Sequence, residues 1–137
     1  MDAQSWLELL AAGEYLLAPG ATAAELDIAE RRIGAGFPAD LRALYQASNG
    51  VDDPRGHWRV VWRLDELVEA ALEVSVLTKW PTTLLAFGDD GCGDPFCMTL
   101  TEPHEVHVWH RIDGESVRLA ATLEEFWRGW DSGAIST

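Results

Sequence analysis

Apolar residues recur at helical spacing through the first third of the chain and predict three short helices. Residues 6–10 predict a short amphipathic helix, and Pro19-Gly20 interrupts the pattern after it. Thr22 and Glu25 match a capping box, in which each side chain accepts a hydrogen bond from the backbone N–H of the other residue. A second helix is therefore expected to begin after Thr22 and to end at residues 34–36, Gly-Ala-Gly.

The third helix is expected between Phe37-Pro38 and Asn49-Gly50. Proline favours the first helical position, and Asn and Gly both tolerate the positive φ that ends a helix. The buried stripe of this helix is expected to consist of Leu41, Leu44 and Tyr45. Segment 51–57 is dense in turn residues and predicts a loop.

The second half of the chain is predicted to be mostly strands. Residues 58–62 alternate as a strand does, and the face that carries Trp58 and Trp62 is expected to pack on helices. Helical spacing returns over residues 64–72. Three later strands are expected to form a meander, with Asp113-Gly114 as a turn signal, over residues 96–101, 105–111 and 116–119.

A second capping box, Thr122 and Glu125, predicts a final helix. Its Trp127 and Trp130 lie three residues apart and are expected to contact the core or to line a groove beside it. The small polar residues 132–137 are expected to fray.

This order of elements predicts the fold class. Helices followed by strands favour an α+β fold with an antiparallel sheet over an alternating parallel α/β fold. The 137 residues fit a single domain over 1–137, and a chain of this length buries enough surface to fold without a metal or a disulfide.

Charge is the strongest signal in the composition. Twenty-three acidic against ten basic residues give a formal net charge of −13. This balance argues against nucleic acid and anionic membranes as partners, because phosphate binding depends on Lys and Arg. It favours a basic protein partner, or it serves solubility alone. The lack of a long apolar run, of a secretory signal and of a disulfide framework predicts a cytoplasmic protein.

The histidines and cysteines do not predict a metal site. On one strand His104 and His110 would lie about 20 Å apart, and His107 would point to the opposite face. Three such ligands cannot meet one zinc ion. Cys92 and Cys97 have neither zinc-ribbon nor redox-pair spacing, so neither a metal nor another cofactor is expected.

Catalytic motifs are also missing from the sequence. Ser48, Ser75 and Ser116 lack the context of a nucleophile elbow. The glycine-rich run 88–93 has no Lys or Ser/Thr behind it, as a phosphate-binding loop requires. We therefore do not expect an enzyme.

Two acidic, glycine-flanked loops are the candidate partner-binding sites, because loops on a rigid scaffold often carry recognition. Their carboxylates are Asp52, Asp53, Asp89, Asp90 and Asp94. Together the loops would form a negative patch suited to Arg and Lys. The alternative for the second loop is a structural turn whose aspartates accept hydrogen bonds from backbone N–H groups.

Five segments, in this order, resemble the SUKH superfamily, the Smi/Knr cell-wall assembly regulator type. The segments are Gly20–Glu25, Phe37–Tyr45, Asn49-Gly50, Phe87–Cys97 and Leu123–Phe126. The resemblance covers about residues 20–130, which leaves 1–19 as a helical extension. Cys92 stands where we expect glycine or another small residue.

The resemblance implies an α+β fold with a central antiparallel sheet flanked by helices. In bacteria it implies an immunity protein that binds and neutralises a cognate toxin, often a nuclease, of a polymorphic toxin system. A basic toxin domain would suit the charge of −13. A scaffold or regulatory module without a toxin partner is the alternative. A small hydrolase or cation-dependent enzyme is a third, which a deep polar pocket gathering Asp89, Asp90 and histidines would support.

Overall fold

The structure is a computed structural model that describes residues 1–74 and 80–137. Ser75, weighed above as a nucleophile, lies outside the described residues. In chain order the elements are α1 (Ala3–Ala11), β1 (Leu16–Leu17), α2 (Ala23–Ile33), α3 (Ala39–Ala47), β2 (Val51–Asp52), β3 (Arg59–Val61), α4 (Leu64–Val74), β4 (Leu84–Asp89), β5 (Pro95–Thr99), β6 (Val106–His110), β7 (Glu115–Ala120) and α5 (Leu123–Ser132). None of the described helices is long and apolar enough to span a membrane.

The predicted α+β class with antiparallel strands is confirmed, and the described strands form two sheets that meet at β3 and β4. One sheet has the order β1-β2-β3 and the other is the meander β4-β5-β6-β7. At the junction, Trp62 N–H donates to the carbonyl of Phe87 over 2.8 Å. A Cβ at Gly88 would lie 1.8 Å from the carbonyl oxygen of Val60, so only glycine fits there.

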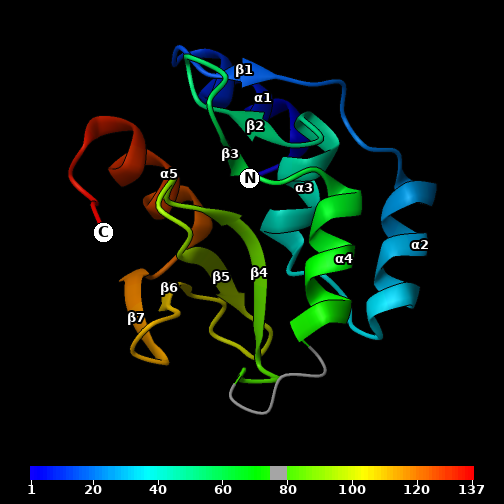
Figure 1. The fold of residues 1–137 in the computed structure, drawn as a ribbon. Helices are drawn as coiled ribbons and strands as arrows, with labels where there is room; N and C mark the ends of the chain where they lie inside the picture. Colours follow the sequence, from blue (N-terminus) through cyan, green and yellow to red (C-terminus); the bar gives the residue numbers. More distant parts are fainter. Residues whose placement is uncertain (75–79) are drawn as a thin grey trace.

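The helices surround the sheets from different sides. Figure 1 shows α2, α3 and α4 grouped beside β4, with α1 and the small sheet at the top of the view. Helix α1 packs on α3, and α5 contacts β7 and α3. Although α1 lies outside the predicted resemblance, its Trp6 and Leu10 are 0% exposed and belong to the main core.

The two predicted capping boxes differ in the structure. Thr22 accepts from Glu25 N–H, and the Glu25 carboxylate accepts from Thr22 N–H, so the first box is complete. Thr122 accepts from Glu125 N–H, but the Glu125 carboxylate accepts from Ala121 N–H over 3.3 Å. Both helices begin where the sequence predicts, because one side-chain cap is sufficient to fix the first turn.

The prediction for the two tryptophans of α5 is confirmed. Trp127 is buried in the main core with its ring centroid 4.8 Å from that of Tyr15. Trp130 is partly buried and packs edge-on against Phe96, at 5.0 Å between ring centroids. Because the two rings reach different parts of the core, α5 is held along its whole apolar side.

The prediction that Trp58 and Trp62 share one face packed on helices is wrong. Trp58 packs on the main core, whereas Trp62 packs on a second apolar cluster on the other face of the large sheet. That cluster consists of Leu84, Ala86, Cys97 and Trp109, with Trp62 and Trp80 at its edge. The strand β3 ends at Val61. The backbone N–H of Trp62 donates instead to Phe87 of β4, so the strand alternation does not continue to Trp62.

The residues after α5 fold back on the helix, which differs from the frayed tail expected from composition. Gly133 ends the helix in the left-handed conformation, with φ of 81°. Ile135 N–H donates to the carbonyl of Gly129 over 2.9 Å, and the Ile135 side chain is partly buried on the core. The Thr137 hydroxyl donates to Asp90 over 2.7 Å.

Candidate partner-binding surface

The loop between β2 and β3 is built around the carboxylate of Asp53, which is only 4% exposed. This carboxylate accepts hydrogen bonds from the backbone N–H groups of Arg55, His57 and Trp58. Burial opposes its charge, but these hydrogen bonds outweigh burial and lower the pKa of Asp53 below its ordinary value. Asp53 thus stays ionised and fixes the loop from inside.

The loop between β4 and β5 is organised in the same way by Asp90. One oxygen of Asp90 accepts from the N–H groups of Cys92 and Asp94, at 2.8 and 3.2 Å, and the other accepts from the Thr137 hydroxyl. Burial again opposes the charge, but the bonds from Thr137 and the backbone lower the pKa of Asp90. Asp89 accepts from Gly91 N–H over 2.7 Å. These contacts support the structural-turn interpretation of this loop.

Trp58 brings the two loops together. Its backbone N–H donates to Asp53 over 3.0 Å, and its indole N–H donates to the carbonyl of Asp89 over 3.3 Å. Gly91 lies against the indole, where an added Cβ would be 3.0 Å from the ring. We call residues 52–58 and 89–94, which this contact joins, the loop pair.

The five carboxylates of the loop pair differ in how their charge is balanced. Asp52 pairs with Arg59, at 3.3 Å, and Asp94 lies 3.1 Å from His110 and 3.7 Å from Arg111. The other three, Asp53, Asp89 and Asp90, have no ion pair within the described chain. The loop pair therefore presents a rigid backbone with uncompensated negative charge.

The histidine and cysteine side chains are dispersed in the structure. His104 contacts the carbonyl of Thr99, His107 lies 3.3 Å from Glu105, and His110 contacts Asp94. Both cysteines are free; Cys92 is exposed and Cys97 is buried. Within residues 1–74 and 80–137, no three or more His, Cys, Asp or Glu side chains are placed to hold a metal ion.

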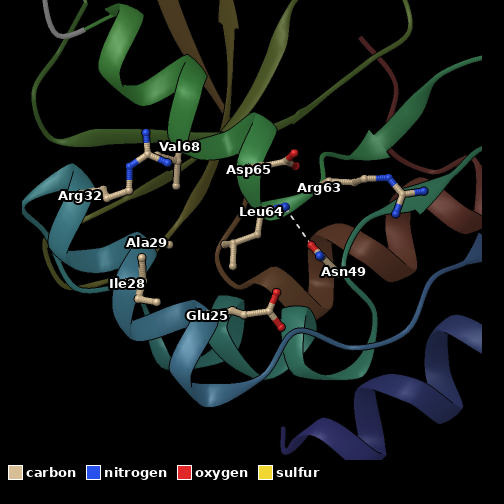
Figure 2. Close-up of a pocket in the computed structure, with 9 residues that line it drawn as sticks. All are labelled: Glu25, Ile28, Ala29, Arg32, Asn49, Arg63, Leu64, Asp65 and Val68. Carbon is tan, nitrogen blue, oxygen red and sulfur yellow. Dashed lines mark hydrogen bonds between the residues drawn. The ribbon is translucent and has the colours of Figure 1, made fainter.

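A groove of about 400 Å³ between α2 and α4 was not anticipated from the sequence. Figure 2 shows Ile28 and Ala29 of α2 facing Leu64 and Val68 of α4, with Arg32 and Arg63 on opposite sides. Asn49 accepts from Leu64 N–H over 2.8 Å and so caps the start of α4. The sequence did contain a signal, because Ile28 is an apolar residue that lies off the apolar stripe of its helix. In the structure its side chain is 50% exposed.

The groove does not gather the residues that a hydrolase would need. Its charged lining consists of Glu25, Asp65, Arg32 and Arg63, and neither Asp89, Asp90 nor a histidine is part of it. Glu25 is engaged in the capping box with Thr22. We therefore assign the groove neither a chemistry nor a partner.

Comparison with known families identifies a match over most of the chain. The model of the SMI1 / KNR4 family (SUKH-1) matches residues 20–129, from just before α2 to within α5. No curated protein matches the chain. The matched span includes both loops of the loop pair and all four strands of the large sheet. Because the match covers most of the chain, this protein belongs to the SMI1 / KNR4 family (SUKH-1).

Proposed function

We propose that this protein is an immunity protein that binds and neutralises a cognate bacterial toxin of a polymorphic toxin system. The observation that carries this proposal is family membership, because SUKH proteins are typically immunity proteins of such systems. Neutralisation then occurs by binding and requires no catalysis by the chain.

The charge of the chain supports a basic toxin as the partner. A net charge of −13 creates a negative potential that attracts a basic domain and raises the rate of encounter. A toxin that acts on nucleic acid has the required chemistry, since its own substrate is recognised through Lys and Arg. We propose a nuclease as the toxin class on this ground.

The loop pair is the proposed contact surface, with Asp52, Asp53, Asp89, Asp90 and Asp94 as its carboxylates. Hydrogen bonds fix both loops before any partner binds, so little conformational entropy is lost in the complex. Asp53 acts through the shape of its loop because it is buried. The other four carboxylates are partly exposed and can face Lys or Arg directly.

The test is growth rescue combined with a binding measurement. The chain is co-expressed with the toxin domain encoded beside its gene, and the dissociation constant of the purified pair is measured at low and high salt. We expect rescue, and weaker binding at high salt because the charges are screened. The chain carrying Asp52→Asn and Asp89→Asn should bind at least tenfold more weakly.

A matched control separates location from net charge. The double variant Glu69→Gln and Glu73→Gln removes two negative charges from exposed positions on α4 and should bind almost as the wild type does. Equal loss in both double variants would remove the loop pair as the contact surface. Failure of the wild type to rescue growth from any toxin encoded nearby would overturn the proposed function, and binding without rescue would favour a scaffold.

A further inference from the structure

Ile112 is the most exposed large apolar side chain in the described part of the chain. It is 91% exposed, whereas the other exposed large hydrophobic residues lie between 37% and 50%. It occupies the turn of residues 111–114, between β6 and β7. An isoleucine left almost wholly in water at the tip of a hairpin has no role in the core of this chain.

The turn that carries Ile112 is fixed against the loop pair. Gly114 N–H donates to the carbonyl of His110 over 2.8 Å, which closes the turn. Arg111 donates through its backbone N–H to Asp94, and through its guanidinium to the carbonyl of Cys92, both at 3.3 Å. The turn therefore continues the proposed contact surface, and the neighbouring backbone of Arg111 is held in place.

The strand after the turn is also uncovered. β7 is the edge strand of the large sheet, and its residues 115–118 are all exposed. Val117, opposite Val108 in the ladder, is 45% exposed. The hairpin thus extends beyond the core and presents apolar surface next to a free sheet edge.

Two carboxylates without an ion pair in the described chain follow the exposed isoleucine. Asp113 and Glu115 are exposed and make no ion pair within the described chain, while Arg111 is already paired with Asp94. The tip therefore combines one apolar side chain with uncompensated negative charge. Its complement is an apolar pocket surrounded by Lys or Arg, which is the chemistry of the basic partner proposed above.

We infer that the β6–β7 turn is the anchor of the complex, in which Ile112 enters an apolar pocket on the basic surface of the toxin. Asp113 and Glu115 pair with basic side chains at the edge of that pocket. The loop pair lies beside this contact, joined to it through Arg111, and supplies further carboxylates to the same surface. This inference rests on the proposed function and adds the residue that dominates the affinity.

The test compares two isoleucines of different location. Ile112→Ser removes the anchor, and Ile28→Ser, on the exposed side of α2, removes a similar side chain away from the turn. Binding of the catalytically inactivated toxin domain encoded beside the gene is measured by calorimetry. We expect Ile112→Ser to raise the dissociation constant about tenfold or more, and Ile28→Ser to change it less than twofold. Thermal melting of both variants confirms that they are folded.

A second pair of variants tests the charges of the turn. The double variant Asp113→Asn and Glu115→Gln should slow association and weaken its dependence on salt, with a smaller effect on dissociation than Ile112→Ser. If the wild type binds the toxin and Ile112→Ser binds equally well, the anchor is overturned while the proposed function stands. If the wild type binds no toxin encoded nearby, the anchor and the proposed function are both overturned.

Discussion

The indole N–H of Trp58 donates to the backbone carbonyl of Asp89, 3.3 Å away and 31 residues later in the chain. This bond joins the β2–β3 loop to the end of β4, in a different sheet. Gly91 completes the contact, because its positive φ and missing side chain let the next loop approach the indole ring. The geometry of the loop pair therefore depends on Trp58.

Alanine at Gly91 should destabilise the protein more than alanine at Gly114. Both glycines have positive φ, 84° and 68°, so each substitution costs about 1 kcal/mol of backbone strain. Only Gly91→Ala also places a Cβ against the Trp58 ring. We expect an additional loss of about 1 kcal/mol, measured by urea unfolding. The additional loss should disappear when Trp58→Leu is present in both proteins; its persistence would contradict the contact.

Asp53→Asn should reduce the pH dependence of stability. Hydrogen bonds in the folded state lower the pKa of Asp53 below its ordinary value of 3.8, to which it returns on unfolding. The contribution of Asp53 to stability is therefore present above pH 3.8 and is lost as the pH falls below it. The variant should unfold at lower urea at pH 7 and lose less stability between pH 5 and pH 3. Asp113→Asn, at an exposed turn, is the control and should change neither.

Arg42→Ala should cost about 1–2 kcal/mol of unfolding free energy, since Arg42 ties α3 to α2. Its guanidinium lies 2.6 Å from Glu30 and 2.9 Å from Asp27, and the Glu30 carboxylate also accepts from Phe37 N–H. The matched control is Arg31→Ala, which removes an exposed arginine that makes no ion pair among the described residues, and it should cost less than about 0.5 kcal/mol. Equal losses would show that the ion pairs contribute nothing measurable.

Ser48→Ala should cost about 1–3 kcal/mol, because it leaves one buried and one partly buried backbone group without their Ser48 partner. The Ser48 hydroxyl is 0% exposed, donates to the carbonyl of Gly50 over 2.6 Å and accepts from Ala18 N–H over 3.0 Å. Ser116→Ala, on the exposed part of β7, should change stability by less than about 0.5 kcal/mol. Calorimetric melting of both variants checks this prediction, and a neutral Ser48→Ala would contradict it.

Local features of the fold were predictable from sequence, and features set by distant contacts were not. The capping box at Thr22 needs only Glu25, three residues away, so its pattern is sufficient. The separation of Trp58 and Trp62 into two clusters depends on Trp62 N–H meeting Phe87 in another sheet, and no pattern within residues 58–62 contains that contact.

In the candidate site, too, local features were predictable from the sequence and features set by distant contacts were not. Composition and turn residues identified the acidic loops, including Asp53 and Asp90. Their proximity depends on Trp58, and the burial of Asp53 depends on how its own loop closes over it. Ile112 could be placed in a turn from sequence. Its exposure follows from the hairpin extending beyond the core, which is a property of tertiary packing.

The unequal burial of the two thiols makes the protein ready for site-specific labelling. Cys92 is exposed in the loop pair, whereas Cys97 is buried, and burial raises the pKa of the Cys97 thiol far above its usual range. The thiolate is the nucleophile that attacks the maleimide alkene, so a maleimide dye at neutral pH should modify Cys92 and leave Cys97 intact. The dye would then report the arrival of a partner at the loop pair by fluorescence, without any engineered cysteine.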